Sequence, residues 1–256
     1  MNNTYKIQSK KVADYYNQWQ QGYNDVYGDT IQAYRPADKN ELMQYIALSS
    51  GIANGMKILD AGCGVCGPAS WLAEHYNVHI TGITVSEIQV EQARKNIKQK
   101  NSADRVEVIY GDYHELSSIF EENTFDKVLF LESLGHSADT LKVITETYKV
   151  LKPGGSIYIK DFYYKEPADA FWKKRIEKVV ANINRLYNYN TLNLNNTLTA
   201  LRSQNFEIDF VKKFSFTDDI SIRYEFEQKF GIDIFDGESE FYPAEWLEIK
   251  CLKSGV

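Results

Sequence analysis

Short apolar runs alternate with helical patterns through the middle of the chain, and this alternation constrains the fold more than any other feature. Strands that alternate with amphipathic helices form parallel βαβ units, in which helices cover both faces of the sheet. We therefore predict an α/β fold with a doubly wound, mostly parallel sheet. The strands expected in this region are residues 57–61, 78–83, 106–110, 127–131 and 156–160.

Two helices between these strands have clear boundaries. Ser86 and Gln89 have the spacing of a capping box, in which the Ser86 side chain caps the helix and Gln89 reaches back to the Ser86 N–H. Val85 and Val90 fall at the positions of a hydrophobic staple. The second helix is expected over residues 139–151, before a Pro-Gly-Gly turn.

The flanking segments are predicted to cover this core. Residues 15–34 and 41–53 are expected to be helical. Residues 182–196 contain seven asparagines, whose side chains compete for backbone hydrogen bonds, so irregular structure or short helices covering a pocket are expected there. Residues 206–214 and 246–252 are interpreted as two further strands, with an inserted piece over residues 217–240.

Composition favours one globular domain. The chain has 256 residues, 43% of them hydrophobic and 14% aromatic, which is enough to build a sizeable core. We expect a single domain over residues 1–256. Its parts would be an N-terminal helical cap (1–55), a ligand-binding core (56–162), a lid insertion (163–204), and final strands with the insertion between them (205–256).

Charge and cysteine content argue against several classes of protein. The net charge of −6 disfavours binding to a nucleic-acid backbone. No apolar run is long enough to span a membrane, and the first residues lack a secretory signal, so a cytoplasmic location is expected. Cys63 and Cys66 have no second pair to complete a zinc site, and no metal is predicted. The sequence leaves the oligomeric state open, and a homo-oligomer is compatible with it.

The strongest chemical signal is the segment Lys57-Ile-Leu-Asp60-Ala-Gly62-Cys-Gly64-Val-Cys-Gly67. It places an acid and a glycine-rich turn between an apolar strand and a helix. Glycines allow a ligand to approach the backbone closely, and the N-terminus of the helix carries partial positive charge. Such a turn fits a nucleotide-like ligand. The same spacing fits the dinucleotide fingerprint, and also a tight turn that binds nothing.

Further motifs follow in a fixed order. They are Gly82-Ile-Thr-Val-Ser86-x-x-Gln89, Gly111-Asp112-Tyr113, Phe125-Asp126 and Leu151-Lys-Pro-Gly-Gly155. With the glycine turn, they resemble the motifs of class I S-adenosylmethionine-dependent methyltransferases, in particular the small-molecule branch that includes sterol, tocopherol, prenyl-diphosphate and natural-product sugar methyltransferases. The resemblance implies a Rossmann-like sheet of seven strands with an antiparallel last strand, and S-adenosylmethionine as cofactor.

The resemblance assigns the glycine turn to the methionine part of the cofactor. The matching residues are Asp60, Gly62, Gly64 and Gly67. The last glycine of the family's turn often lies one residue earlier, so Gly67 departs from the pattern.

The next two motifs are assigned to the ribose and the adenine. Thr84 stands where most members have an acid for the ribose, and this exchange also disfavours the dinucleotide alternative, which needs that acid. Gln89 is either a ribose ligand or only the capping partner. Asp112 matches the acid that accepts from the adenine amino group, with Tyr113 beside it, although Gly-Asp is also ordinary turn chemistry.

Three residues are candidates for the removal of a proton from the acceptor. Glu132 follows the fourth strand and resembles the base of prenyl-diphosphate C-methyltransferases, but it is equally compatible with anchoring the cofactor or a loop amide. His136 and Asp161 resemble the pair that serves natural-product O-methyltransferases. The structural alternatives are that His136 caps a helix and that Asp161 pairs with a lysine.

The resemblance favours carbon methylation of a small, isoprenoid-type acceptor that is largely apolar, with or without a diphosphate. Methylation of a hydroxyl or an amine by His136 and Asp161 is the alternative. Ten aromatic residues are available to bind such an acceptor or to pack the core, namely Tyr15, Tyr16, Tyr23, Tyr27, Tyr34, Phe162, Tyr163, Tyr164, Tyr187 and Tyr189. Hypotheses from other classes are a nicotinamide-dependent oxidoreductase and a binding module without catalysis.

Overall fold

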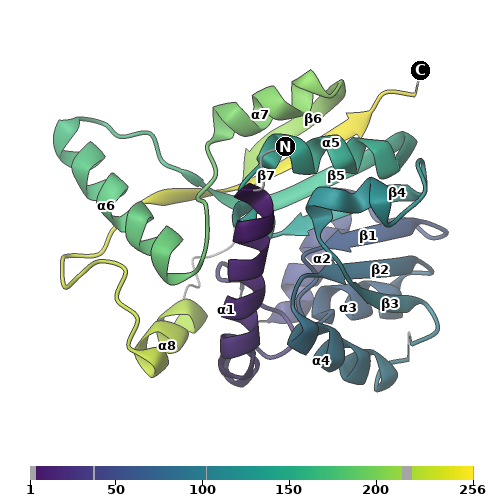
Figure 1. The fold of residues 1–256 in the computed structure, drawn as a ribbon, viewed down its shortest axis with the longest axis horizontal. Coiled ribbons are helices and arrows are strands. Elements are labelled where there is room, and N and C mark those ends of the chain that lie inside the picture. Colours follow the sequence, from purple (N-terminus) through teal and green to yellow (C-terminus); the bar gives the residue numbers. More distant parts are fainter. Residues whose placement is uncertain (1–3, 37, 102, 215–220, 256) are drawn as a thin grey trace.

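A computed structural model describes residues 4–36, 38–101, 103–214 and 221–255. These residues form one sheet of seven strands in the order β3-β2-β1-β4-β5-β7-β6 (Figure 1). All neighbours are parallel except β7, which runs antiparallel to β5 and β6. The predicted sheet and its antiparallel last strand are confirmed. The strands are β1 (Lys57–Ala61), β2 (His79–Thr84), β3 (Val106–Tyr110), β4 (Phe125–Leu131), β5 (Leu151–Tyr164), β6 (Phe206–Lys213) and β7 (Ala244–Lys253).

Helices cover both faces of the sheet. The helices α2 (Lys39–Ser50), α3 (Gly67–His75) and α4 (Glu87–Lys98) pack on one face, and α5 (Thr140–Val150) and α7 (Leu194–Ser203) pack on the other. Successive side chains of a strand point to opposite faces. On β1, Ile58 therefore lies in one core and Leu59 in the other, and both are fully buried. A strand buried on both sides explains the continuous apolar runs.

Three further helices flank the carboxyl ends of the strands. They are α1 (Thr4–Tyr27), α6 (Ala170–Leu186) and α8 (Ser221–Phe230). The helix α1 lies between α4 and α8 (Figure 1). Its Tyr23 stacks on Phe226 of α8, with ring centroids 4.4 Å apart. Two short 3-10 helices, η1 (Tyr113–Ser118) and η2 (Leu134–His136), follow β3 and β4.

The predicted helix over residues 15–34 is confirmed as far as Tyr27 and is wrong over its last seven residues. The helix α1 ends at Tyr27, because Gly28 adopts a left-handed conformation with φ of 66° and its N–H donates to the Asn24 carbonyl. Residues 28–34 form a loop instead. Similarly, α2 ends at Ser50, where Gly51 has φ of 76°.

The asparagine-rich segment contains more helix than expected. The helix α6 continues through Asn182 and Asn184, and only residues 187–193 are irregular. The Asn182 side chain donates to the Ile234 carbonyl and to Asp236, and Asn184 accepts from the Thr191 N–H. Because these side chains bond to other segments, they do not compete with the backbone of their own helix.

Half of the predicted capping box is confirmed. Ser86 caps α4 and accepts from the Gln89 N–H at 3.1 Å. The reciprocal bond is absent among the described residues, because the Gln89 side chain accepts from Thr84 at 2.6 Å and donates to Gln20 of α1 at 2.9 Å. The Ser86 hydroxyl in turn donates to Asn17 of α1. These contacts attach α1 to the turn that follows β2.

The predicted strands agree with the observed ones within two residues, except that β5 is longer at both ends. It includes the Pro-Gly-Gly turn and pairs with β7 as far as Tyr164, so that Asp161 and Phe162 lie within the strand. The inserted piece between β6 and β7 includes α8, and its first residues, 217–220, fall outside the described ones. Of the helices described, none combines the length and apolar character needed to cross a membrane.

Candidate functional site

Two cavities lie at the carboxyl ends of the strands. The glycine-loop cavity, about 820 Å³ including space open to solvent, is lined by residues at or beyond the carboxyl ends of β1 to β4, including Gly62, Thr84 and Asp112. The aromatic cavity, about 940 Å³ including space open to solvent, is lined mainly by tyrosines of α1 and by residues of the α6–α7 connection and β7. Both cavities share four lining residues: Tyr16, Ile31, Glu132 and His136. Ligands of open α/β sheets bind at this edge, where the strand order reverses.

Seven of the eight residues expected to hold a cofactor line the glycine-loop cavity: Asp60, Gly62, Gly64, Thr84, Gln89, Asp112 and Tyr113. Gly67 does not line it. A Cβ atom on Gly67 would lie 1.8 Å from the carbonyl oxygen of Asp29, so this glycine allows the 28–34 loop to rest against the start of α3.

The glycine turn itself has the open backbone that the sequence indicated. Gly62 and Gly64 have φ of 82° and 53°, in the left-handed region that favours glycine. A Cβ atom on Gly62 would also lie 2.5 Å from the Cβ atom of Ser133. The turn therefore excludes larger side chains and leaves the backbone exposed to the cavity.

Asp60 presents a buried carboxylate to this cavity. Its side chain belongs to a residue that is 2% exposed, and burial raises its pKa to about 7. No hydrogen bond from a described residue stabilises the ionised form. A carboxylate in this state is well placed to bind a cationic group, because a nearby positive charge would offset the cost of its burial.

Polar side chains around Thr84 and Asp112 are held by their neighbours. Thr84 and Gln89 are joined by the hydrogen bond described above. Asp112 accepts from the backbone N–H and the ring Nδ1 of His114, at 2.9 and 2.6 Å, and the other ring nitrogen of His114 contacts Ser137. Burial alone would raise the pKa of Asp112, but its bonds with His114 hold the pKa below its usual value. Tyr113 donates to the Ser133 carbonyl.

His136 lies at the boundary between the two cavities with a defined tautomer. Its Nδ1 is 3.0 Å from the Asn188 carbonyl, which can only accept, so Nδ1 carries the proton. Burial lowers the pKa of His136 to about 4, and the ring is neutral at neutral pH. Nε2 is therefore an acceptor, and the Tyr16 hydroxyl donates to it at 2.9 Å.

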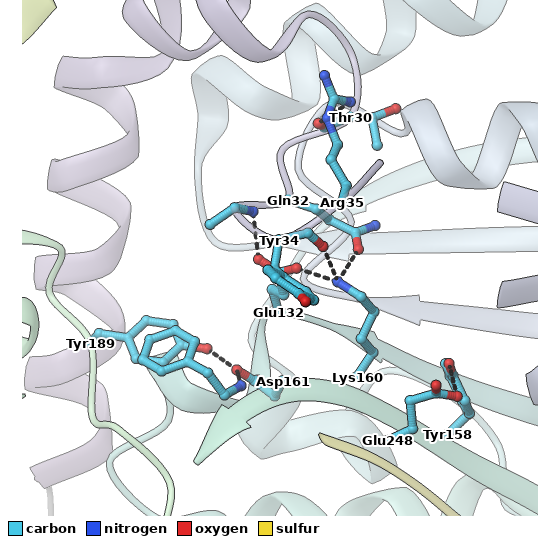
Figure 2. Close-up of polar contacts among 12 residues, drawn as sticks. Thr30, Gln32, Tyr34, Arg35, Glu132, Tyr158, Lys160, Asp161, Tyr189 and Glu248 are labelled. Atoms are coloured by element: carbon cyan, nitrogen blue, oxygen red, sulfur yellow. Dashed lines mark hydrogen bonds and ion pairs between the residues drawn. The ribbon is translucent and has the colours of Figure 1, made fainter. Parts of the chain in front are cut away.

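Glu132 is engaged on both carboxylate oxygens. One forms an ion pair with Lys160 of β5, and the other accepts from the Ala33 N–H at 2.7 Å (Figure 2). The Lys160 ammonium also donates to Gln32 at 2.8 Å and to the Tyr34 carbonyl at 3.0 Å. Because Lys160 is fully buried, its charge needs these acceptors. Glu132 has the contacts of a residue that anchors the 28–34 loop.

Asp161 follows Lys160 on β5 but points in another direction (Figure 2). It lines neither cavity. It accepts from the Tyr189 hydroxyl and from the Gly135 N–H, and burial raises its pKa to about 7. It pairs with no lysine among the described residues, contrary to the alternative that the sequence left open. Asp161 holds Tyr189, whose ring packs 4.5 Å from that of His136.

The aromatic cavity uses six of the ten aromatic residues that the sequence offered: Tyr16, Tyr23, Tyr27, Phe162, Tyr187 and Tyr189. Tyr15, Tyr34 and Tyr163 are buried in the packed clusters instead. The sequence analysis did not identify three residues of this region. Ile31 and Arg223 line the cavities, and Lys160 pairs with Glu132. Lys160 had a signal, since a lysine between apolar strand residues needs a buried partner. No group of three or more His, Cys, Asp and Glu side chains among the described residues could hold a metal.

Comparisons with known proteins agree with this geometry. A family model described as a methyltransferase domain matches residues 52–212. Sterol 24-C-methyltransferase of Saccharomyces cerevisiae is 36% identical over 125 residues, which cover 49% of this chain and 32% of that protein. Methyltransferase GfsG of Streptomyces halstedii is 31% identical over 171 residues, covering 63% of this chain and 61% of that protein. The matched region thus spans about a third of the length of the sterol methyltransferases.

Solved structures share the fold across nearly the whole chain. The cyclase SpnF has a TM-score of 0.78 at 22% identity, with 96% of each chain covered. Geranyl diphosphate C-methyltransferase of Streptomyces coelicolor has a TM-score of 0.74 at 16% identity, with 96% of this chain and 97% of that chain covered. Since the family model matches well over half of the sequence, the chain belongs to the methyltransferase domain family, with the fold of the class I, S-adenosylmethionine-dependent methyltransferases.

Proposed function

We propose that this protein transfers a methyl group from S-adenosylmethionine to a small, largely apolar acceptor. The observation that carries the proposal is the shared boundary of the two cavities at Tyr16, Ile31, Glu132 and His136. Methyl transfer is an in-line displacement, which needs donor and acceptor side by side with little water between them. A cofactor in the glycine-loop cavity and an acceptor in the aromatic cavity would meet at this boundary.

The residues of the glycine-loop cavity fit the cofactor. Asp60 would bind the ammonium group of its methionine part, beside the open backbone of Gly62 and Gly64. Thr84 with Gln89 would bind the ribose, and Asp112 with Tyr113 would bind the adenine, since all four residues line this cavity. When bound, S-adenosylmethionine supplies an electrophilic methyl group on a sulfonium. We assign Gly67 to packing of the 28–34 loop rather than to the cofactor.

His136 is the proposed proton acceptor. Its Nε2 lone pair faces the boundary, and an acceptor hydroxyl that replaces Tyr16 would donate to the same atom. A base with a pKa near 4 is weak, but a hydroxyl becomes strongly acidic as its oxygen is alkylated, so proton transfer is favourable late in the reaction. The Asn188 carbonyl would then stabilise the imidazolium through Nδ1. Asp161 acts as a positioning residue in this scheme.

The acceptor would lie against aromatic faces. Ile183, Tyr187 and Tyr189 line the aromatic cavity, and they belong to the segment 163–204, which would act as a lid over the acceptor. Together with His136, these apolar walls favour methylation of a hydroxyl on an apolar molecule.

Carbon methylation of an isoprenoid alkene is the second candidate. It is supported by the similarity to sterol 24-C-methyltransferase and by the aromatic rings, which stabilise a carbocation. Glu132 would then be the base, although its pairing with Lys160 and Ala33 makes it a weaker candidate than His136.

Geraniol separates the two candidates, because it contains both a hydroxyl and alkenes. We expect the purified protein to convert S-adenosylmethionine and apolar alcohols of this kind to S-adenosylhomocysteine and a methyl ether, identified by mass spectrometry. His136→Gln should reduce kcat/KM by about 10²–10⁴-fold, the usual contribution of a general base. His79→Gln, the control, makes the same change at an exposed histidine at the start of β2, away from both cavities, and should stay within a few-fold of the wild type. A C-methylated product that depends on Glu132 but not on His136 would favour the second candidate.

A further inference from the structure

One cationic side chain that lines the aromatic cavity donates no hydrogen bond to a described residue. Arg223 of α8 is the sole cationic side chain among the described residues that line this cavity. Its side chain is 19% exposed, and Nε lies 3.6 Å from Glu227, beyond hydrogen-bond length. Nε therefore forms an ion pair with Glu227 but is buried without a hydrogen-bond partner, and no described residue accepts a hydrogen bond from the guanidinium. Its other contact is with the Tyr224 ring, 4.9 Å from Cζ.

A mostly buried arginine without hydrogen-bond acceptors lowers the stability of the folded protein. A guanidinium carries five N–H donors in a fixed planar arrangement, and donors withdrawn from water without acceptors destabilise a fold. Glu227 offsets the charge through the ion pair but accepts no hydrogen bond from the guanidinium, and the oxygen that faces Nε accepts from the Tyr187 hydroxyl at 2.9 Å. By comparison, the buried Lys160 near the same site has three oxygen acceptors. Arg223 therefore has donors available for a ligand in the aromatic cavity.

We propose that Arg223 binds an anionic group of the acceptor, a carboxylate or a phosphate ester, while the apolar part of the acceptor lies against the tyrosine rings. The proposal rests on the proposed function, since it concerns the acceptor of the same site. The planar fork of arginine suits both groups, because each presents two oxygens for parallel hydrogen bonds. The preferred acceptor is thus amphiphilic and carries this anionic group in addition to the hydroxyl or alkene that is methylated. A neutral alcohol such as geraniol lacks the anionic group and would bind more weakly.

The carboxylates of the cavity argue against a cationic acceptor. Glu132 has both oxygens bonded within the protein. Glu227 accepts from Tyr187 and faces Arg223. An ammonium group in this cavity would also lie near the like charge of Arg223, whereas an anionic group meets guanidinium donors that no described residue uses.

Binding of four probes with ten carbon atoms each tests this inference: decanoate, decyl phosphate, decanol and decylamine. Isothermal titration with the full-length protein, with and without S-adenosylhomocysteine, gives each dissociation constant. We expect one or both anions to bind about tenfold or more tightly than decanol, and Arg223→Gln to remove this preference while leaving decanol within about twofold. Carboxylate and phosphate are distinguished by which anion binds more tightly.

Two further variants keep the test independent of folding. Lys229→Gln removes the same charge from the exposed face of α8 and should change no affinity. Glu227→Gln removes the competing carboxylate, and should tighten binding of the anions severalfold. Equal binding of anions and decanol, a preference that survives in Arg223→Gln, or tightest binding of decylamine would each overturn the proposal. Failure of S-adenosylhomocysteine to bind would instead contradict the proposed function.

Discussion

The ionisation of Asp60 should control how tightly the cofactor binds. Burial raises the pKa of Asp60 to about 7 in the cofactor-free protein. If the ammonium group of the cofactor lies beside this carboxylate, binding selects the ionised form and lowers its pKa. The affinity should therefore weaken as the pH falls below 7, with uptake of cofactor accompanied by release of a proton.

The size of this effect follows from the fraction ionised. Near pH 6 about one Asp60 side chain in ten is ionised, and near pH 8 about nine in ten. The dissociation constant should consequently rise about tenfold from pH 8 to pH 6, which corresponds to about 1.4 kcal/mol. Asp60→Asn should bind more weakly than the wild type at pH 8 and show no such dependence.

Isothermal titration with S-adenosylhomocysteine measures this directly, and buffers of different ionisation enthalpy count the protons released. Asp161→Asn is a matched control, because burial also raises the pKa of Asp161 to about 7 but its side chain lines neither cavity. Its pH dependence should equal that of the wild type. An affinity that is independent of pH in the wild type, or a slope that persists in Asp60→Asn, would refute the reasoning.

The stability of the cofactor-free protein should change with pH in the direction opposite to the affinity for the cofactor. The folded pKa of Asp60 lies above its ordinary value of 3.8, so the cofactor-free protein loses stability as the pH rises from 3.8 to about 7. At pH 8, Asp60→Asn should raise the free energy of unfolding by up to roughly 4 kcal/mol, at about 1.36 kcal/mol for each pKa unit. Urea unfolding of both proteins at pH 8 checks this, and a less stable variant would contradict it.

Three further changes test the packing and the base. In Gly135→Ala the new methyl would lie 2.0 Å from the Tyr189 ring, so the ring must move. Calorimetry should show that the free energy of unfolding falls by about 1–3 kcal/mol, and turnover should weaken as well. Lys160→Met leaves the Glu132 carboxylate buried without its partner, and urea unfolding should show a loss of about 3–5 kcal/mol, much of it recovered by adding Glu132→Gln. At saturating cofactor, kcat should stay level from pH 8 to about 5 and fall toward about 4, where His136 protonates; a fall centred near 6.5 would show an unperturbed histidine.

Local rules made the sheet and the glycine-loop cavity predictable. Each strand is an apolar run bounded by turn residues. Each expected cofactor residue that lines the cavity lies at or just beyond the carboxyl end of one of these strands, or about one helical turn later for Gln89. Parallel strands bring their carboxyl ends to one edge of the sheet, so residues such as Asp60 and Asp112 lie at the same edge regardless of the conformation of the loops. This part depends on contacts within short stretches of sequence.

The acceptor side depends on contacts between distant segments, and here the sequence was a poorer guide. Gly28 ends α1 early and leaves residues 28–34 as a loop. Glu132 therefore pairs with Lys160 and accepts from the Ala33 N–H, rather than being free to act as a base. Gly67 is required by Asp29, a residue in that same loop. Arg223 reaches the aromatic cavity from an insertion late in the chain, and no periodicity or motif indicated this.

A crystal structure of the protein with S-adenosylmethionine bound would test the central claim most directly. We predict the cofactor in the glycine-loop cavity, with its ammonium group beside Asp60 and its methyl carbon at the shared boundary, in contact with Tyr16 or His136 and facing the aromatic cavity. A methyl carbon directed away from the aromatic cavity, or a cofactor bound elsewhere, would contradict the claim that the two cavities form one site for methyl transfer.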